Sequence, residues 1–371
     1  MVNPWQGRRV FITGHTGFKG GWLSLWLVGR GAQIRGFALD PSTEPSLFAA
    51  ASVSSVLDDV RGDIRDHAKL EAAMTEFSPE VVFHLAAQPL VRRSYADPIG
   101  TYATNVMGTA HVLEAVRKTP SVRAVVCVTT DKCYQNQEWV WPYRETDALG
   151  GYDPYSSSKA CAEIVSAAYR SSFFPLDRLQ EHGVAIATAR AGNVIGGGDW
   201  SEDRLIPDLI RGFQTHQPAH IRHPKAIRPW QHVLEPLFGY IQLAEQLLAQ
   251  KKDAASAFNF GPGEEDAWPV DRIADALARM WGEGACWISD AGANVHEAQS
   301  LKLDASKARA ELGWRPRFNI ETALEWTVDW YRAWKQGTDL QRETQSQIAA
   351  YQNIAGSANS ELAATERRNI P

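Results

Sequence analysis

The sequence lacks the features that mark membrane proteins, disulfide-stabilised domains and nucleic-acid-binding proteins. No uninterrupted apolar stretch approaches the roughly 20 residues that a membrane-spanning helix needs. Only four of the 371 residues are cysteines, and none has CxxC spacing or a nearby histidine. We therefore expect free thiols in a reducing compartment and no metal site. The net charge of −5 and the lack of a basic stripe argue against nucleic acid or an anionic membrane as a partner.

What is present is the composition of an ordinary globular protein. Hydrophobic residues make up 44% of the chain and charged residues 22%, which is enough apolar material for about two domains at this length. The first residues do not form a charged segment followed by an apolar one, the pattern of a secretory leader. We therefore expect a cytoplasmic location.

Short apolar runs alternate with helix-like segments through the first part of the chain. These strand-like runs are residues 8–14, 33–40, 81–87, 124–130 and 185–191. Short buried strands separated by helices are typical of βαβ units and of a parallel sheet covered on both faces. The sequence therefore predicts an α/β fold, with a Rossmann-like, doubly wound parallel sheet in residues 1–192.

The pattern changes at Asn193. Loops rich in glycine, proline and tryptophan then interrupt helical segments such as 270–281 and 320–332. We predict a smaller, mostly helical C-terminal lobe over residues 193–335, interleaved with the first domain and covering the ligand. Residues 336–371 are polar and are predicted to form a C-terminal tail.

A glycine pattern between the first predicted strand and the first predicted helix indicates a dinucleotide-binding turn. Gly14, Gly17 and Gly20 stand in the segment GHTGFKG, where glycine allows a tight turn and lets the backbone approach a pyrophosphate at the helix N-terminus. Asp40 follows Gly20 by twenty residues, at the end of the second predicted strand. A carboxylate there binds ribose hydroxyl groups and repels a 2′-phosphate, so NAD is favoured over NADP. A turn or cap before Pro41 is the alternative role for Asp40.

Tyr155 and Lys159 have the spacing that places two side chains on one face of a helix, one turn apart. A lysine ammonium group lowers the pKa of a neighbouring phenol from about 10 towards neutrality. The phenolate can then take a proton from a sugar hydroxyl group while a hydride leaves the same carbon for nicotinamide. Thr130, at the end of a predicted strand, and the following Asp131 and Lys132 are expected near the same point.

In this order the motifs resemble the extended short-chain dehydrogenase/reductases, the group that contains nucleotide-sugar epimerases and dehydratases. The matching segments are GHTGFKG, GDIRD, HLAAQ, TNVMGT, TTDKCY and YSSSK. Longer blocks within residues 5–335 are more specific, and they resemble the branch of this family that dehydrates CDP-D-glucose. Among these blocks are TTDKCYQNQEWVWPYRETDALGGYDPYSSSK and RAGNVIGGGDW.

The resemblance implies a lyase that uses NAD in a closed redox cycle on CDP-D-glucose. Tyr155 would take the proton from the hexose O4 while NAD accepts the hydride from C4. The resulting ketone acidifies the C5 proton, so water leaves across C5 and C6, and NADH returns its hydride to C6. The product would be a 4-keto-6-deoxy sugar nucleotide, an early precursor of deoxyhexoses in a surface polysaccharide.

At one position the chain departs from the related dTDP-glucose dehydratases. In those enzymes the strand threonine is followed by an Asp that acts as acid for the C6 hydroxyl group and a Glu that acts as base for C5. Here the pair is Asp131 and Lys132. Asp131 would remain the acid, which requires a raised pKa. Lys132 is a cation at its reference pKa of about 10.4, so it acts as the base only if burial or Lys159 lowers that pKa. Otherwise it stabilises the enolate oxygen or positions Asp131, and another group is the base. A surface lysine with no role is the remaining alternative.

The resemblance also implies contacts on both sides of the reacting centre. The implied catalytic residues are Thr130, Asp131, Lys132, Tyr155 and Lys159. The implied cofactor contacts are Gly14, Gly17, Phe18, Gly20, Asp40, Asp63, Ile64, Leu85, Ala86, Gln88, Thr104, Tyr155 and Lys159. The implied substrate contacts are Thr130, Asn193, Arg204, Arg228, Asn259 and His296. The two arginines suit a diphosphate, because a guanidinium fork matches phosphate oxygens; a surface salt bridge or loop turn is the alternative for each downstream contact.

Three other functions stay open. Residue chemistry alone does not distinguish CDP from dTDP, GDP or UDP sugars, so another nucleotide-sugar 4,6-dehydratase is possible. A UDP-sugar 4-epimerase shares Tyr155, Lys159 and NAD, but it needs no acid for elimination, so Asp131 argues against it. A non-catalytic NAD-sensing regulator has little use for the Tyr155 and Lys159 pair. The resemblance further implies a homodimer or a dimer of dimers that associates through segments 103–117 and 159–170.

Overall fold

The computed structural model describes residues 3–290 and 301–368, with side chains through residue 354. Its centre is a seven-stranded sheet with the order β10-β6-β5-β4-β1-β2-β3, in which every pairing is parallel. The strands are β1 (Arg9–Thr13), β2 (Gln33–Ala38), β3 (Asp58–Arg61), β4 (Val81–His84), β5 (Ala124–Val128), β6 (Ala185–Ala191) and β10 (Ala257–Phe260). The predicted Rossmann-like fold class is confirmed.

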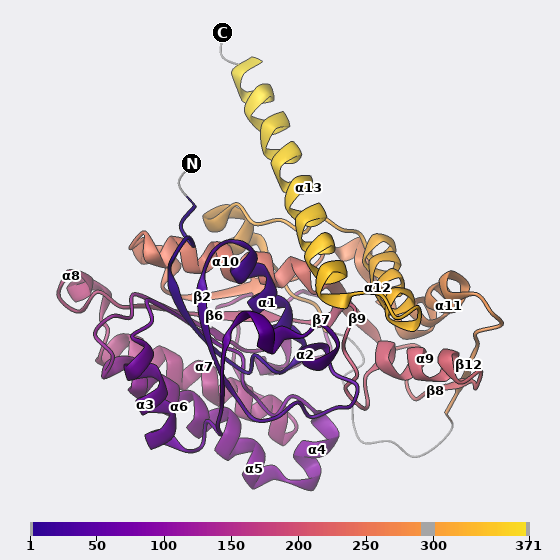
Figure 1. Cartoon of the computed structure of the whole chain (residues 1–371), viewed down its shortest axis with the longest axis horizontal. Coiled ribbons are helices and arrows are strands. Elements are labelled where there is room, and N and C mark those ends of the chain that lie inside the picture. Colours follow the sequence, from indigo (N-terminus) through magenta and orange to yellow (C-terminus); the bar gives the residue numbers. More distant parts are fainter. Residues whose placement is uncertain (1–2, 291–300, 369–371) are drawn as a thin grey trace.

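Helices cover both faces of this sheet (Figure 1). The main covering helices are α1 (Phe18–Gly29), α3 (His67–Phe77), α6 (Gly108–Arg117), α7 (Pro154–Ser172) and α10 (Leu234–Leu248). Neighbouring strand residues enter opposite cores, because side chains alternate along a strand. Val125 packs in the core that contains α3 and α6, whereas Val126 packs in the core that contains α1 and α10. Residues buried on both faces explain why these strands are continuous apolar runs.

The strand order reverses at β1. After β1, the chain forms β2 and β3 on one side of β1. It then crosses over and forms β4 and β5 on the other side of β1. In open parallel sheets, ligands bind outside the carboxyl ends of the strands at such a reversal. The predicted glycine turn follows β1 directly, so the fold places it at the expected ligand site.

The second half of the chain forms a smaller, mostly helical lobe on two short sheets. These sheets have the orders β11-β9-β7 and β12-β8. Their strands are β7 (Asn193–Ile195), β8 (Ala219–Ile221), β9 (Ile227–His232), β11 (Ala267–Pro269) and β12 (Trp287–Ser289). The helices here are α9 (Leu205–Gln214), α11 (Val270–Trp281), α12 (Ile320–Lys335) and α13 (Leu340–Arg368). Shorter helices elsewhere are α2 (Leu47–Ala50), α4 (Val91–Ala96), α5 (Pro98–Tyr102) and α8 (Leu179–His182).

The lobe and the sheet domain share elements. After β9 the chain returns through α10 and adds β10 to the main sheet beside β6. The strand β10, which completes the main sheet, lies beyond the first predicted boundary at residue 192. The division into residues 1–192, 193–335 and 336–371 stays a prediction.

The last helix begins inside the core. The first turns of α13 bury Leu340, Ile348 and Tyr351, which lie at helical spacing on one face. The Tyr351 ring packs edge-on against Trp26 of α1 with centroids 5.7 Å apart, and the helix then projects away from the body (Figure 1). The beginning of the predicted polar tail is therefore a docked helix. Within the described ranges, no helix combines the length and apolar character that crossing a bilayer requires.

Candidate active site

The turn after β1 requires glycine at two positions. Gly14 has a φ of +78°, and a Cβ atom there would lie 2.7 Å from the backbone nitrogen of Ala86. A Cβ on Gly20 would lie 2.1 Å from the Gly14 carbonyl oxygen. Gly17 is the N-cap of α1 and supplies no capping side chain, which leaves the helix dipole and first amide groups facing the ligand site. This close-packed turn fits a dinucleotide pyrophosphate.

The other predicted cofactor residues lie along the same edge of the sheet. Asp40 follows β2 with an 88% exposed side chain, 3.3 Å from the Arg61 guanidinium group, so its carboxylate is accessible to ribose hydroxyl groups. Asp63 follows β3, where a hydrogen bond from Arg65 lowers its pKa below the ordinary value. Ile64 is buried against Gly108.

Three further predicted cofactor residues follow β4 and lie near the start of α6. Leu85 and Ala86 come directly after β4. The backbone amide of Gln88 donates to Asn105 Oδ1 at 2.8 Å. Phe18 opens α1, and Thr104 lies in the π-helical segment before α6. The predicted cofactor residues thus follow β1, β2, β3 and β4 or lie at the starts of α1 and α7, except Thr104 in the π-helical segment before α6. This arrangement fits NAD.

Helix α7 presents Tyr155 and Lys159 to the end of β5. The helix begins with Pro154 after the N-cap Asp153, whose side chain accepts a 2.9 Å hydrogen bond from the Ser156 amide. Tyr155 and Lys159 are both buried, and Lys159 Nζ donates to the Val128 carbonyl oxygen at 3.2 Å. The spacing argument thus places both side chains as predicted, although their catalytic roles remain proposals.

Burial dominates the protonation of this pair in the unliganded chain. It raises the pKa of Tyr155 to about 12, while the neighbouring Thr130 hydroxyl group acts in the opposite direction. Burial also lowers the pKa of Lys159 to about 8, against the attraction of Glu163. Among the cations, Arg204 lowers the pKa of Tyr155, but desolvation of the phenolate is the larger effect. The expectation that Lys159 brings the phenol towards neutrality stays a prediction.

Asp131 has the environment of a proton donor. It begins a short 3-10 turn (Asp131–Cys133) and is buried, with Oδ1 accepting a 3.0 Å hydrogen bond from the Thr130 hydroxyl group. Its Oδ2 has no partner in the described part of the chain. Burial raises the pKa of the Asp131 carboxyl group, against the attraction of Lys132. A raised pKa is what the predicted acid requires.

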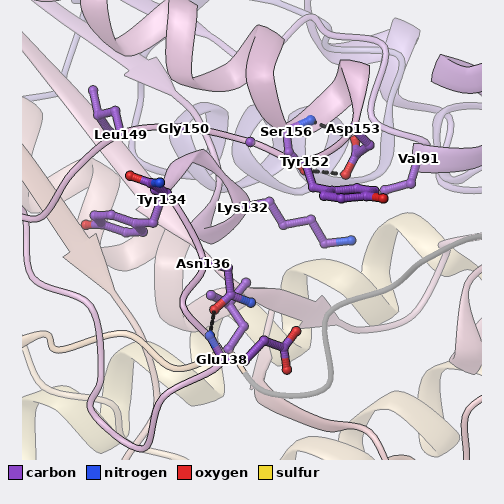
Figure 2. A pocket seen from close by; sticks show the side chains of 13 residues that line it. Val91, Lys132, Tyr134, Asn136, Glu138, Leu149, Gly150, Tyr152, Asp153 and Ser156 are labelled. Atoms are coloured by element: carbon purple, nitrogen blue, oxygen red, sulfur yellow. Dashed lines mark hydrogen bonds between the residues drawn. The ribbon is translucent and has the colours of Figure 1, made fainter.

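Lys132 points into a cavity of about 590 Å³. Figure 2 shows its side chain extending between the Tyr152 ring and Glu138. The cavity is also lined by Val91, Tyr134, Gln135, Asn136, Leu149, Gly150, Gly151, Asp153, Ser156 and Leu301. It opens beside the N-terminus of α7 and has the size of a small-molecule site. Among the described residues that line this cavity, Lys132 is the one predicted catalytic residue; Tyr155, Lys159 and Asp131 do not line it.

The predicted substrate contacts differ in burial and in their partners. Arg228 is buried in β9 and acts electrostatically on Asp131, and Arg204 precedes α9 and lies 3.0 Å from Asp199. Asn193 opens β7 and is half-buried. Asn259 is buried in β10, where its amide group donates to the carbonyl oxygens of Tyr143 and Asp304. His296 lies outside the described residues.

Three tryptophans and His232 of the loops and strands around the site differ in exposure. Trp200 is buried, whereas Trp139 and Trp141 are exposed, and Trp139 stacks on Tyr143 with centroids 5.3 Å apart. His232 is buried beside Trp22, and burial lowers its pKa to about 3, which fits a structural role.

Sequence reasoning assigned no role to Lys19, yet the structure places it among the charged groups of the site. Lys19 is the second residue of α1. Burial lowers its pKa to about 7, helped by the charges of Arg204 and Lys159, while Asp131 acts in the opposite direction. A charged residue at the start of an otherwise apolar helix was the available signal.

The parallel sheet, its glycine turn and the Tyr155–Lys159 helix define a short-chain dehydrogenase/reductase. A family model described as GDP-mannose 4,6 dehydratase matches residues 11–261. The chain is 53% identical over 349 residues to the CDP-glucose 4,6-dehydratase of Salmonella typhimurium, covering 94% of this chain and 97% of that enzyme. It is 29% identical over 352 residues to a dTDP-glucose 4,6-dehydratase of Xanthomonas campestris pv. campestris, with 88% and 94% covered. The chain therefore belongs to the nucleotide-sugar 4,6-dehydratase family.

Solved structures agree on the fold. The dTDP-glucose 4,6-dehydratase of Bacillus anthracis in complex with NAD matches with a TM-score of 0.73 and 22% identity, over 90% of this chain and 100% of that one. A UDP-glucose 4-epimerase of Thermotoga maritima with UDP-glucose matches with a TM-score of 0.74 and 22% identity, over 87% and 98%. Because dehydratases and epimerases share the fold, the fold alone does not select the reaction.

Proposed function

We propose that this enzyme converts CDP-D-glucose to CDP-4-dehydro-6-deoxy-D-glucose and water, with NAD as a resident cofactor. The observation that carries the substrate is the 53% identity, over 94% of the chain, to an enzyme named for that reaction. The glycine turn, the exposed Asp40 carboxylate and the NAD-bound dehydratase of the same fold support the cofactor.

The first part of the reaction belongs to α7. Bound NAD supplies a hydride acceptor for C4 and a hydride donor for C6. Tyr155 takes the proton of the hexose O4, and Thr130 holds that oxygen beside the phenol. A cation next to Tyr155 favours its phenolate, so we assign Lys159 to that electrostatic role and to the ribose hydroxyl groups of the cofactor.

The second part belongs to the turn after β5. Burial raises the pKa of Asp131, so we assign to it the proton that the C6 hydroxyl group takes up as water leaves. Lys132 extends into the cavity. It either takes the C5 proton and returns it to C5 as the hydride reaches C6, or it stabilises the enolate oxygen while another group carries that proton. The remaining predicted contacts, Asn193, Arg204 and Arg228, would bind the diphosphate and sugar, because guanidinium and amide groups bind phosphate oxygens.

A side-by-side assay of CDP-, dTDP- and UDP-glucose tests this function. The 4-keto product absorbs in alkali, so its appearance with CDP-glucose alone is the expected result. Conversion of UDP-glucose to UDP-galactose with no 4-keto product would instead establish a 4-epimerase. Preference for dTDP-glucose would retain the reaction and overturn the substrate.

We further propose a cytoplasmic homodimer that supplies deoxyhexoses for surface polysaccharide. Apolar side chains on α5, on the segment before α6, on α7 and at the C-cap of α7 are exposed: Ile99, Met107, Ile164 and Phe173. Exposed apolar groups on neighbouring helices are typical of subunit contacts. Light scattering of the wild type and of Ile164→Glu tests this contact, and an unchanged mass for the variant would contradict it.

A further inference from the structure

A buried ion pair lies directly behind the reacting centre. Glu163 of α7 and Arg190 of β6 are 2.8 Å apart, and only 3% of each side chain is exposed. Neither residue lines the cavity around Lys132. A buried ion pair costs desolvation energy and often adds little to stability compared with apolar packing. Its presence at this position calls for a role in geometry.

Glu163 fixes the beginning of the catalytic segment. Its Oε1 accepts a hydrogen bond from the hydroxyl group of Thr129, and its Oε2 accepts one from Thr188 at 2.7 Å and one from Arg190. Burial would raise the pKa of Glu163, but the charge of Arg190 and these hydrogen bonds lower it, so the carboxylate stays ionised. Thr129 directly precedes Thr130, the residue that contacts Asp131.

Arg190 fixes the end of the same segment. Its Nη1 donates to the Tyr134 hydroxyl group at 2.7 Å, and the guanidinium carbon lies 4.9 Å from the centre of the Tyr134 ring. Tyr134 in turn donates to Asn259 Oδ1 at 2.7 Å. We name Glu163, Arg190, Thr129 and Tyr134 the polar clamp.

The polar clamp encloses the residues assigned to elimination and joins them to those assigned to oxidation. Asp131 and Lys132 lie between Thr129 and Tyr134, so both ends of their segment are bonded to the Glu163–Arg190 pair. Glu163 also lies one helical turn after Lys159 and two turns after Tyr155 on α7. Helix α7 therefore carries Glu163 as well as Tyr155 and Lys159. Through buried contacts, the polar clamp connects the groups assigned to oxidation with those assigned to elimination.

We propose that the polar clamp is a positioning device that holds Asp131 and Lys132 in register with Tyr155, so that elimination follows oxidation on one bound hexose. This inference rests on the proposed dehydratase function. Loss of fixed geometry lowers the rate of a step without removing its chemical groups, and a displacement of about 1 Å can cost on the order of 100-fold. The clamp residues act through Asp131 and Lys132 and are not themselves catalytic.

Two substitutions at Thr129 test the proposal. Thr129→Val keeps the shape and removes the hydroxyl group that bonds Glu163, whereas Thr129→Ser keeps the hydroxyl group. With CDP-D-glucose we expect Thr129→Val to lower kcat by on the order of 10- to 100-fold with little change in KM. Enzyme-bound NADH should accumulate during turnover, because oxidation continues while elimination slows. Thr129→Ser should restore the wild-type rate and remove the accumulation.

Tyr134→Phe tests the other end of the segment and keeps the proposal testable if Thr129→Val does not fold. It removes the hydroxyl group that accepts from Arg190 and donates to Asn259, and we expect the same accumulation of NADH. Tyr240→Phe is the matched control, since its buried hydroxyl group has no partner within the described ranges, and it should behave as wild type.

The outcomes separate the inference from the function on which it rests. Wild-type kcat in Tyr134→Phe, equal rates for the Val and Ser variants, or a slower rate without bound NADH would overturn the positioning role while wild-type turnover stands. Absence of wild-type turnover on CDP-D-glucose would refute the proposed function, and the inference with it.

Discussion

The Thr130 hydroxyl group donates a 3.0 Å hydrogen bond to one oxygen of the Asp131 carboxyl group, whose other oxygen is buried without a partner in the described chain. A buried carboxylate oxygen that lacks a donor disfavours the ionised form. Burial raises the pKa of the Asp131 carboxyl group, whereas the charge of Lys132 and the Thr130 hydrogen bond act in the opposite direction. Burial therefore favours the proposed acid at the start of the turn that also carries Lys132.

Replacement of Asp131 by Asn should separate the two halves of the reaction. The amide keeps the size of the side chain and its acceptor for Thr130, but it has no proton to give. We expect elimination to slow by about 10²- to 10⁴-fold, the usual contribution of a positioned acid, while bound NADH still forms in a single turnover. Asp66→Asn, at the N-cap of α3, should show wild-type kinetics. Normal dehydration by Asp131→Asn would remove Asp131 from the mechanism.

Tyr155→Phe should cost orders of magnitude in kcat and leave NAD affinity near normal, because only the proton acceptor is lost. Burial raises the pKa of the phenol to about 12 in the unliganded protein, so we also expect an ultraviolet titration to show this tyrosine ionising at lower pH once NAD is bound. Tyr169→Phe on the same helix is the control. Unchanged turnover in Tyr155→Phe would refute the base assignment.

Lys132→Glu tests the departure from the dTDP-glucose dehydratases. The substitution places a second carboxyl group beside Asp131 and removes the cation that faces the cavity. We expect oxidation to survive and elimination to fail, as measured by bound NADH and by the release of the 4-keto product. Lys132→Met removes the charge alone and should show the same block. If Lys132→Met dehydrates at the wild-type rate, the lysine has no role of its own; if only Lys132→Glu does so, the carboxylate has replaced the lysine as base.

Gly20→Ala should weaken cofactor binding. The added Cβ atom would lie 2.1 Å from the Gly14 carbonyl oxygen, so the turn that approaches the pyrophosphate must open. Gly29→Ala at the end of the same helix meets no atom within 4 Å and should leave binding unchanged, with stability equal or higher by up to about 1 kcal/mol. Calorimetric titration with NAD measures both, and equal affinity in the two variants would contradict the prediction.

Glu235 should make stability depend on pH. Its carboxyl group is buried in α10, where it accepts hydrogen bonds from the Phe318 amide at 2.9 Å and the Tyr351 hydroxyl group at 2.8 Å. Burial raises its pKa from 4.5 to about 7. The folded protein thus binds the proton more tightly than the unfolded chain, and the stability contributed by this group is fully present below pH 4.5 and lost as pH rises to about 7.

The size of this effect follows from the same pKa difference, and it amounts to about 3 kcal/mol above pH 7. Thermal unfolding of the wild type and Glu235→Gln at several pH values between 4.5 and 8 measures it. The variant should lose the decline over this window, because glutamine does not ionise. Parallel pH profiles for the two proteins would show that Glu235 is not responsible.

Local patterns in the sequence sufficed for the fold class and for two parts of the site. The alternation of short apolar runs with helices predicted the parallel sheet, and the glycine spacing predicted the turn between Gly14 and Gly20. The four-residue spacing of Tyr155 and Lys159 predicted a shared helix face. Each of these depends on backbone geometry over a few residues, which the order of residues specifies directly.

The strand at Ala257–Phe260 shows where this reasoning failed. This strand pairs in parallel with β6, from which it is separated by a long stretch of sequence. It is too short to be recognised as a strand between glycine- and proline-rich loops. Asn259, predicted as a substrate contact, is buried by that pairing and donates to backbone carbonyl oxygens. Strand pairing over long separations is set by the competition among all possible partners.

The sequence by itself determined which chemical groups the enzyme carries and the helix or turn on which each one stands, because short-range spacing fixes those. Only the tertiary structure decided their pKa values and their neighbours. Examples are the raised pKa values of Asp131 and Tyr155, the placement of Lys19, and the hydrogen bonds of Glu163 to Thr129 and to β6. Desolvation and long-range contacts depend on which distant segments pack around a group, and no local pattern records that packing.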